Sequence, residues 1–266
     1  MIPARSILPD RRIGERGTTL DIQGIKTLND WVRESDNIVF FGGAGVSTES
    51  GIPDFRSVDG LYHQQWKYPP EEILSHSFFE RNPEEYYRFH REKLVIDGVK
   101  PNRAHLKLAE LERAGKLRAV ITQNIDGLHT KAGSKKVFEL HGSVWRNYCE
   151  RCGKSWSPEY IRDSKGVPCC TCGGRIKPDV VLYEEGLDQA VLSGAVSAIR
   201  QADLMIVAGT SLTVYPAAGL LQYFRGSHLV LINRDPTPFD GSADLVLHEK
   251  VGAVLSRITV TPVSAG

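Results

Sequence analysis

The residues of this chain best suited to chemistry are its five cysteines, which all lie between positions 149 and 172. They form two pairs, Cys149-x2-Cys152 and Cys169-x2-Cys172, separated by sixteen residues. Two tight turns that each present two thiolates can hold one tetrahedral zinc ion. Cys170 offers a tighter alternative with Cys172, but the two-residue spacer is the commoner geometry. The spacing therefore predicts Cys169 as the third ligand.

The predicted zinc site is structural, not catalytic. No histidine lies between Cys149 and Cys172, and four thiolates fill the coordination sphere, so no position remains for water. Such a site contributes roughly 10–16 kcal/mol of apparent binding energy to folding. The clustering of the cysteines favours a metal site in a reducing cytoplasm over a disulfide framework spread along the chain.

A second group of reactive side chains precedes the cysteines. The apolar run Ala119–Thr122 is followed by amide, carboxylate and imidazole groups in the sequence TQNIDGLH, which ends at His129. The sequence ELHG, which contains His141, follows shortly after. Polar groups gathered at the end of a strand indicate a binding or catalytic site. The alternative is that these are hydrogen-bonded surface histidines, which are commoner than catalytic ones.

A glycine-rich turn, Gly42–Gly45, follows the short apolar strand expected at Ile38–Phe41. Glycines let the backbone approach a pyrophosphate, and the N-terminus of a following helix stabilises its charge. The third glycine of the usual dinucleotide fingerprint would fall at Thr48 and is missing, and Asp59 lies in an irregular loop and not at a strand end. These departures count against an ordinary nicotinamide dehydrogenase.

Two more strand ends carry small or polar residues. Gly209-Thr210-Ser211 follows the apolar run Leu204–Ala208, and Asn233-Arg234-Asp235 follows the run that begins at Leu229. Ligands of open parallel sheets bind at the carboxyl ends of strands, near the point where the strand order reverses. Three such turns suit an extended nucleotide, although each alone is explained by a structural turn.

The elements that must position these groups alternate between short apolar strands and helices. Helical spacing of apolar residues predicts helices over Ile22–Glu34, Ala104–Ala114 and Leu187–Gln201. This alternation predicts an α/β fold with a parallel sheet covered on both faces. The pattern breaks between Tyr148 and Lys177, where cysteine, glycine, proline and charged residues predict a small insert.

Composition excludes several classes of function. The 266 residues contain 33 lysines and arginines against 32 acidic residues, so no broad positive field is available for nucleic acid or a membrane surface. The longest apolar runs are far shorter than the roughly 20 residues that a bilayer span needs. Residues 1–20 predict a polar N-terminal extension without a secretory signal. We expect a cytoplasmic protein that binds neither nucleic acid nor a membrane.

The chain resembles the sirtuin family, most closely its bacterial undifferentiated branch, from about residue 22 to 252. The resemblance rests on the paired cysteines and on four motifs in the family's order: GAGVSTESGIPDFRS (43–57), TQNIDGLH (122–129), ELHGS (139–143) and GTSLTVYPAA (209–218). It implies a Rossmann-like NAD-binding domain and a small zinc-binding lobe inserted into it. The implied bounds are 21–145 and 178–260 for the domain and 146–177 for the zinc module, with a further part of the small lobe from about 56–100.

The resemblance also implies a role for individual residues. His141 would be the general base, with Asn124 beside the ribose and Asp126 holding the nicotinamide carboxamide. Phe55 would shield the reactive ribose after nicotinamide leaves. The complete implied NAD site is Ala44, Thr48, Phe55, Arg56, Gln123, Ile125, Asp126, His141, Thr210, Ser211, Asn233 and Val251, of which the last four hold the adenosine end.

The implied activity is NAD-dependent removal of acyl groups from lysine side chains of proteins, with transfer to ADP-ribose and release of nicotinamide. The substrate would pair with Pro178–Glu184 as an added strand. Family members that prefer acidic acyl groups carry a tyrosine and an arginine in the loop after PDFR. Residues 57–75 contain Tyr62 and Tyr68 but no arginine, which favours uncharged acyl groups. The alternative activity is NAD-dependent protein ADP-ribosylation, which would use the same pocket.

Overall fold

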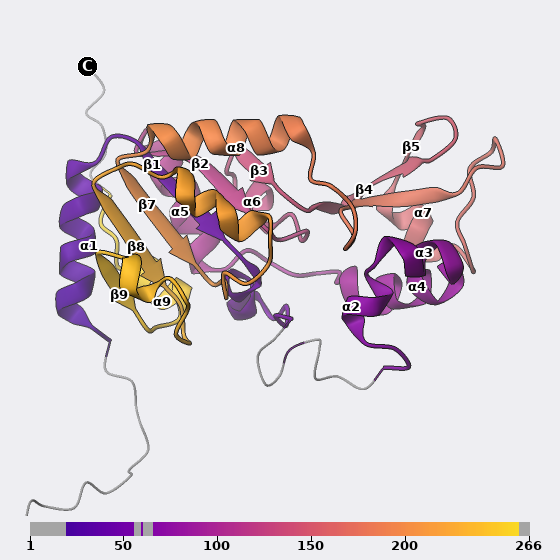
Figure 1. Cartoon of the computed structure of the whole chain (residues 1–266), viewed down its shortest axis with the longest axis horizontal. Helices are drawn as coiled ribbons and strands as arrows, with labels where there is room; N and C mark the ends of the chain where they lie inside the picture. The colour runs from indigo at the N-terminus through magenta and orange to yellow at the C-terminus, as the bar shows by residue number, and fades with distance from the viewer. Residues whose placement is uncertain (1–19, 56–59, 61–65, 261–266) are drawn as a thin grey trace, which may run out of the picture.

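The computed structural model describes residues 20–55, 60 and 66–260 of the chain. It contains a six-stranded sheet and a three-stranded sheet, which lie toward opposite ends of the long axis (Figure 1). The N-terminal extension predicted for residues 1–20 falls outside the described residues, apart from Leu20.

The six-stranded sheet is parallel throughout and has the order β3-β2-β1-β7-β8-β9. This is the strand order of the doubly wound dinucleotide-binding fold, and it reverses between β1 and β7. Its strands are β1 (Ile38–Gly42), β2 (Leu117–Thr122), β3 (Val137–Glu139), β7 (Leu204–Ala208), β8 (His228–Ile232) and β9 (Leu245–Leu247). Every residue of β1 and β7 is buried, as expected of central strands covered on both faces. The predicted α/β, Rossmann-like class is confirmed.

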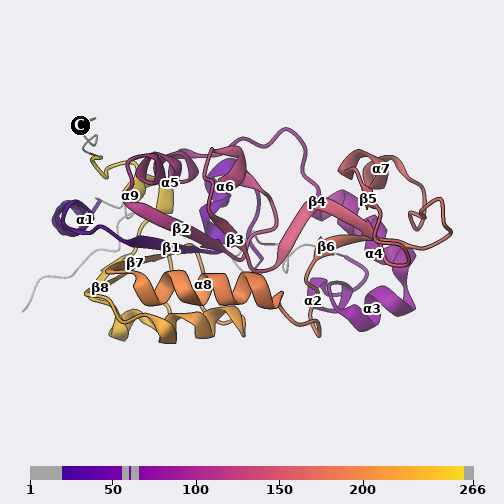
Figure 2. The same ribbon diagram turned by 90° about the horizontal axis from the view of Figure 1, so that it is seen from above.

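Helices cover both faces of this sheet (Figure 2). One face carries α5 (Arg103–Arg113), α6 (Leu128–Lys131) and α9 (Val251–Leu255), and the other carries α8 (Gln189–Gln201) and the 3-10 helix η5 (Ala217–Tyr223). Helix α1 (Ile22–Glu34) packs at the outer end, beside β9. No helix in the described ranges is long and apolar enough to cross a bilayer.

The segment after β1 differs from the expectation of a helix. Two 3-10 turns, η1 (Ala44–Val46) and η2 (Thr48–Ser50), follow the glycine turn. The second ends at Gly51, whose φ of 90° is left-handed, and Pro53 follows closely. A left-handed residue and a proline both prevent a helix from continuing, so the turn leads directly into the loop beside the site.

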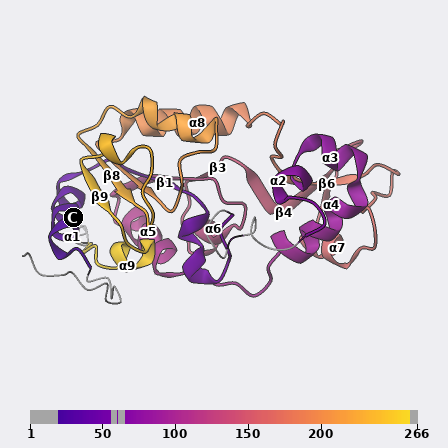
Figure 3. The same ribbon diagram turned by 60° about the horizontal axis from the view of Figure 1, so that its bottom comes forward.

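The three-stranded sheet is antiparallel, in the order β5-β4-β6. Its strands are β4 (Gly142–Cys149), β5 (Ser155–Trp156) and β6 (Ile176–Val180), and it packs with α2 (Pro70–Ile73), α3 (His76–Arg81), α4 (Pro83–Phe89), the π-turn η4 (His90–Leu94) and α7 (Pro158–Asp163). We call residues 66–99 and 142–180 the small lobe and the rest of the described chain the large lobe (Figure 3). The small sheet extends beyond the expected insert, 146–177, at both ends.

The small lobe has an aromatic core that the sequence patterns did not indicate. Phe79, Tyr86, Tyr87 and Phe89 are almost completely buried. The rings of Phe79 and Tyr86 meet edge to face with centroids 4.7 Å apart, and Tyr86 and Tyr87 do so at 5.3 Å. The cysteine-bearing segment, which has little apolar content of its own, therefore packs on aromatic side chains from α3 and α4.

Candidate active site and zinc site

The glycine turn after β1 packs against a second turn at the end of β7. The Gly45 N–H donates to the Gly209 carbonyl at 2.8 Å. A Cβ on Gly45 would lie 2.7 Å from the Gly209 Cα, and a Cβ on Gly209, whose φ is 59°, would lie 2.4 Å from the Val46 nitrogen. These glycines are therefore required for the close contact between the two turns. The contact lies at the point where the strand order reverses.

The end of β2 holds the imidazole of His141 in one orientation. His141 Nδ1 lies 2.9 Å from the Gln123 carbonyl oxygen, so Nδ1 carries the proton and donates it. The other nitrogen, Nε2, therefore has a free lone pair. Gln123 itself is fixed by its side-chain Nε2, which donates to Thr210 Oγ1 at 3.0 Å.

The environment of His141 favours the neutral imidazole. Burial lowers the pKa of His141 below the usual range, and the hydrogen bond to the Gln123 carbonyl only partly opposes this. A neutral imidazole with a free Nε2 can accept a proton at physiological pH. The ring is therefore able to act as a general base.

His141 also marks the point where the chain passes from one sheet to the other. The N–H of the preceding residue, Leu140, bonds the Thr122 carbonyl of the large sheet, while the His141 carbonyl accepts from the Val181 N–H at 3.0 Å. Gly142 follows with a φ of 74°, and a Cβ there would lie 1.9 Å from the Asp179 carbonyl oxygen. Only glycine fits at this crossing.

The Asp126 carboxylate accepts hydrogen bonds at both oxygens. Ser47 Oγ donates to Oδ2 at 2.6 Å, and the Leu128 N–H donates to Oδ1 at 2.8 Å. Asn124 Nδ2 donates to the same Ser47 hydroxyl at 3.1 Å. Burial raises the pKa of Asp126, and the two hydrogen bonds to the carboxylate act in the opposite direction.

These groups line one cleft of about 380 Å³ between the two lobes. This volume is within the range of roughly 300–1,000 Å³ that ligand pockets occupy. Of the residues predicted from sequence, the cleft is lined by Ala44, Phe55, Gln123, Asn124, Ile125, Asp126, His141, Thr210, Ser211 and Asn233. The lining follows the carboxyl ends of β1, β2, β7 and β8, which suits an extended dinucleotide.

Three predicted residues are placed elsewhere or are not described. The hydroxyl of Thr48 donates to the Gly45 carbonyl at 3.0 Å, outside the cleft lining. Val251 is 3% exposed and packs in the large-lobe core at the start of α9. Arg56 lies outside the described residues, as does Tyr62.

The structure adds residues to the cleft that the sequence analysis did not select. Ser47 lies between motif residues that were selected, and its position inside the GAGVST motif was the available signal. The segment expected to pair with substrate also lines the cleft, from Val180 to Glu185. It is held by hydrogen bonds from the Val181 N–H to the His141 carbonyl and from the Tyr183 N–H to the Leu74 carbonyl.

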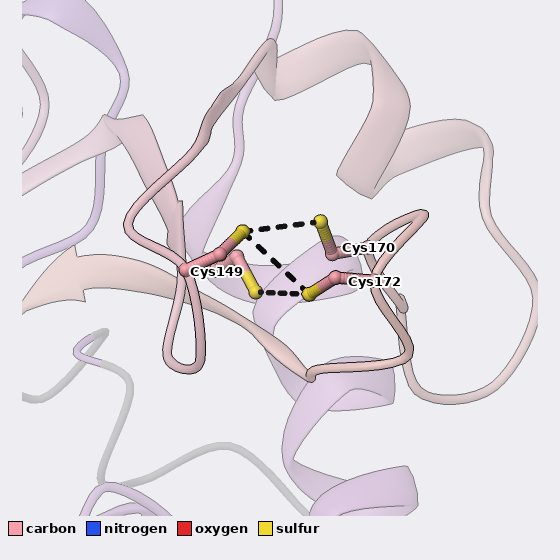
Figure 4. Close-up of side chains that lie close together, drawn as sticks. Cys149, Cys170 and Cys172 are labelled. Atoms are coloured by element: carbon pink, nitrogen blue, oxygen red, sulfur yellow. Dashed lines mark hydrogen bonds between the residues drawn. The ribbon is translucent and has the colours of Figure 1, made fainter.

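The cysteine cluster lies in the small lobe at the end of β4, and Figure 4 shows its sulfurs facing one another. Its members are Cys149, Cys152, Cys170 and Cys172, whose sulfurs all lie within 4.8 Å of one another. The Cys149–Cys172, Cys152–Cys172 and Cys152–Cys170 sulfurs are 3.4, 3.5 and 3.7 Å apart. Four sulfurs at zinc-bonding distance in a tetrahedron lie about 3.8 Å apart. The donor set and its spacing fit one structural zinc ion.

The prediction of Cys169 as the third ligand is wrong, and Cys170 takes that place. Cys169 forms an antiparallel bridge with Arg175, and successive side chains of an extended segment point to opposite sides. The Cys169 thiol is accordingly exposed and lies 3.5 Å from the Val167 carbonyl.

A tight turn places Cys170 in the cluster. The Gly173 N–H donates to the Cys170 carbonyl at 2.8 Å, and Gly173 has a φ of 81°. Hydrogen bonding from the backbone of Cys172 lowers the pKa of the Cys170 thiol to about 6. The pKa of the Cys172 thiol moves in the opposite direction, so these shifts describe an uneven sharing of protons within the cluster.

Comparison with known proteins identifies the family. The Sir2 family profile matches residues 43–216. An NAD-dependent protein deacetylase of Clostridium perfringens is 58% identical over 238 residues, which cover 88% of this chain and 98% of that protein. One of Cutibacterium acnes is 55% identical over 233 residues, covering 87% of this chain and 96% of that protein.

Solved Sir2 structures agree with the fold. A complex with a deacetylated p53 peptide and 3′-O-acetyl ADP-ribose has a TM-score of 0.82 at 44% identity, covering 88% of this chain and 96% of that one. A complex with a p53 peptide and NAD+ has a TM-score of 0.79 at 44% identity, with the same coverage. Since the profile spans more than half of the chain and the relatives align over most of it, this chain belongs to the Sir2 family, the sirtuins.

Proposed function

We propose that this protein is an NAD-dependent protein deacetylase, which transfers the acetyl group of an acetyl-lysine side chain to ADP-ribose and releases nicotinamide. The observation that carries the proposal is the convergence of a neutral imidazole, an amide and a carboxylate in one interlobe cleft. Relatives that are called NAD-dependent protein deacetylases align over most of the chain, which supports the same activity.

Each cleft residue has a distinct task in this reaction. The Asp126 carboxylate accepts from the carboxamide of nicotinamide, and Asn124 borders the ribose. When nicotinamide leaves, the acyl oxygen of the lysine amide bonds to C1′ of the ribose. His141 Nε2 then takes the proton of a ribose hydroxyl, whose oxygen attacks the acyl carbon. The bond from that carbon to the lysine nitrogen breaks, the lysine leaves as the free amine, and one water is taken up to leave the acetyl ester of ADP-ribose. A positioned base of this kind contributes about 10²–10⁴-fold.

The rest of the site binds the remainder of NAD and the peptide. Thr210, Ser211 and Asn233 hold the adenosine end, whereas Thr48 and Val251 lie outside the lining of the cleft. Phe55 and Arg56 border the reactive ribose. The peptide binds along Pro178–Glu184, and the acyl group is uncharged because residues 57–75 contain no arginine.

The zinc ion contributes no step to the reaction and holds the small lobe in shape. The NAD-binding domain corresponds to the large lobe, and the zinc-bearing part corresponds to the small lobe, whose paired strands run from Gly142 to Val180. We place the protein in the cytoplasm, where the clustered thiols stay reduced.

One assay tests the function. The protein is incubated with NAD and an acetyl-lysine peptide, and nicotinamide and peptide mass are followed. We expect nicotinamide release that requires the acetylated peptide and is matched by loss of its acetyl group. Release accompanied by transfer of ADP-ribose to protein, without deacetylation, would identify an ADP-ribosyltransferase and reject the proposal.

A further inference from the structure

A buried row of side chains lies behind the Asp126 carboxylate. Ser47 Oγ, which donates to Asp126, is 3.5 Å from Nε2 of His105. His105 lies in the first turn of α5, and its ring packs edge-on against His129 with centroids 4.7 Å apart. Both histidines are buried and neither lines the cleft, so the proposed reaction assigns them no task.

Hydrogen bonds determine which nitrogen of His105 carries the proton. The Asn102 N–H donates to His105 Nδ1 at 3.2 Å, as part of the capping box that starts α5. A ring nitrogen that accepts a hydrogen bond is unprotonated. Burial lowers the pKa of His105 to about 4, so the ring is neutral at physiological pH. Its single proton is therefore on Nε2, beside Ser47.

The same reasoning fixes the direction of the Ser47 hydroxyl. A hydroxyl has one proton to donate and two lone pairs that accept. Asn124 Nδ2, at 3.1 Å, and His105 Nε2 both donate to Ser47 Oγ. The serine proton is left for Asp126 Oδ2, at 2.6 Å.

We propose that His105 is a positioning residue for the reaction: its Nε2–H holds the Ser47 hydroxyl so that the serine proton always points to Asp126. The carboxylate then faces the cleft as a hydrogen-bond acceptor in a single orientation. This is the state that an N–H donor of the substrate, such as the carboxamide of nicotinamide, requires. The inference rests on the proposed function, because that function supplies the group that Asp126 binds.

His129 supports this arrangement from the other side. Its ring lies between His105 and Phe40, with a centroid distance of 5.9 Å to the latter. Burial lowers the pKa of His129 well below its usual range, with His105 as a second cause. Two neutral rings in contact avoid the repulsion that two charged rings would have.

Two substitutions separate positioning from a purely structural role. In His105→Asn the short side chain reaches the place of Nδ1, so it keeps the cap acceptor and loses the donor to Ser47. In His105→Gln the longer side chain places an amide N–H near the position of Nε2, so it can keep the donor to Ser47, and glutamine at this third helical position is also a usual capping-box residue. We expect kcat/KM for NAD to fall roughly tenfold in His105→Asn and to recover mostly in His105→Gln. Thermal unfolding of His105→Asn should stay close to that of the wild type because the cap acceptor is kept, so its loss of activity would not follow from instability.

A control and a double substitution complete the test. Asp21→Ala removes the cap of α1, far from the cleft, and should lower stability while leaving activity unchanged. On a Ser47→Ala background, His105→Asn should cause no further loss, because its effect passes through Ser47. If activity simply follows stability in the two His105 variants, or if the losses multiply on the Ser47→Ala background, the proposal is overturned.

Calorimetric titration with NAD gives a readout that does not depend on turnover. NAD affinity should fall in His105→Asn and be restored in His105→Gln. If the wild-type protein binds NAD but does not deacetylate the peptide, the proposed function fails, and the order of these affinities still decides the role of His105. Equal affinities in both variants and the wild type would reject that role.

Discussion

The large lobe and the small lobe build their cores from different side chains. In the large lobe, aliphatic residues of buried parallel strands pack against amphipathic helices on both faces of the sheet. In the small lobe, aromatic residues of short helices pack on a narrow sheet, and four thiols gather at the end of β4. Both lobes contribute to the cleft, but the described part of the large lobe has two buried apolar clusters and the small lobe has one.

The two lobes therefore contribute differently to the site: the large lobe supplies most of its polar side chains, and the small lobe supplies one wall of the cleft. The polar groups of the cleft extend from strand ends of the large lobe, where burial of the strands fixes them. The small lobe closes the other side of the cleft, and we expect the zinc ion that its four cysteines fit to contribute to its order. The comparison therefore predicts that substitutions of the cluster cysteines, of cleft residues and of residues between the lobes reduce stability or activity by very different amounts.

The largest effect is expected from removing a thiol of the cluster. Cys170→Ala, or chelation of the metal, removes a site that contributes roughly 10–16 kcal/mol to folding. We expect loss of bound zinc, loss of all deacetylation and unfolding of the small lobe, with the helical signal of the large lobe largely retained. Zinc content by atomic absorption and circular dichroism measure this.

Cys169→Ala is the matched control, because its side chain points away from the cluster. It should bind one zinc ion and change stability by no more than about 0.5 kcal/mol. If Cys169→Ala lost zinc and Cys170→Ala kept it, the ligand assignment would be reversed. A metal-free Cys170→Ala variant with a folded small lobe would show that the aromatic core alone stabilises this lobe. That result would contradict the expected dependence of the small lobe on zinc.

The second effect is chemical and leaves both lobes folded. His141→Ala should reduce deacetylation by about 10²–10⁴-fold, the contribution of a positioned base. NAD binding and thermal stability should remain close to those of the wild type. A fully active His141→Ala variant would remove this residue from the mechanism.

The wild-type pH profile sharpens the same prediction. The base works as neutral imidazole, so activity is complete above the pKa of His141 and is lost as pH falls through it. Burial lowers that pKa, so the acidic limb of kcat/KM should lie below the pH of about 6.5 at which a free imidazole titrates. A limb that began above pH 7 would contradict this assignment.

The third effect tests the contact between the two glycine turns. Gly209→Ala places a Cβ 2.4 Å from the Val46 nitrogen and puts alanine at a φ of 59°. We expect a loss of roughly 3–5 kcal/mol in unfolding free energy, measured in urea, and weaker NAD binding. Gly115→Ala is the control, since its φ of 72° is similar but nothing lies within 4 Å of the added Cβ. It should cost only about 1–2 kcal/mol.

The smallest effect is expected at an ion pair between the lobes. Arg146 on β4 bonds Asp179 of β6 at 2.7 Å and also Glu139 at the end of β3 in the large sheet. Its guanidinium is partly exposed, so Arg146→Ala should cost at most about 1 kcal/mol of stability, less at high salt. A loss of several kcal/mol in urea unfolding would mean that the lobes are stabilised jointly, contrary to the comparison.

The sequence predicted the large lobe better than the small one, for a physical reason. The strand Leu204–Ala208 and the helix Ile22–Glu34 have the predicted bounds, because long apolar patterns set them. Helices α2 to α4 are too short to show a helical period. The choice between Cys169 and Cys170 depended on the pairing of Cys169 with Arg175, which spacing does not reveal.

The cleft residues could be predicted from the sequence where they lie in motifs that directly follow a strand. Gln123, Asn124 and Asp126 follow β2 directly, and the structure brings them together with His141. Ser47 was missed because its role appears only when residues 79 positions apart in sequence meet, at its hydrogen bond to Asp126. Val251 was selected from a loose motif, and its side chain packs in the core.

The crossing at His141 has a consequence for how the two lobes can move. The ring is tied to the end of the large sheet through Gln123, while the carbonyl of the same residue is tied to the segment along which the peptide is proposed to bind. A hinge rotation of the small lobe would therefore pivot at the base itself. The imidazole would keep its distance to the reacting sugar while the peptide swings toward or away from it, so that opening for product release leaves the proton acceptor in place.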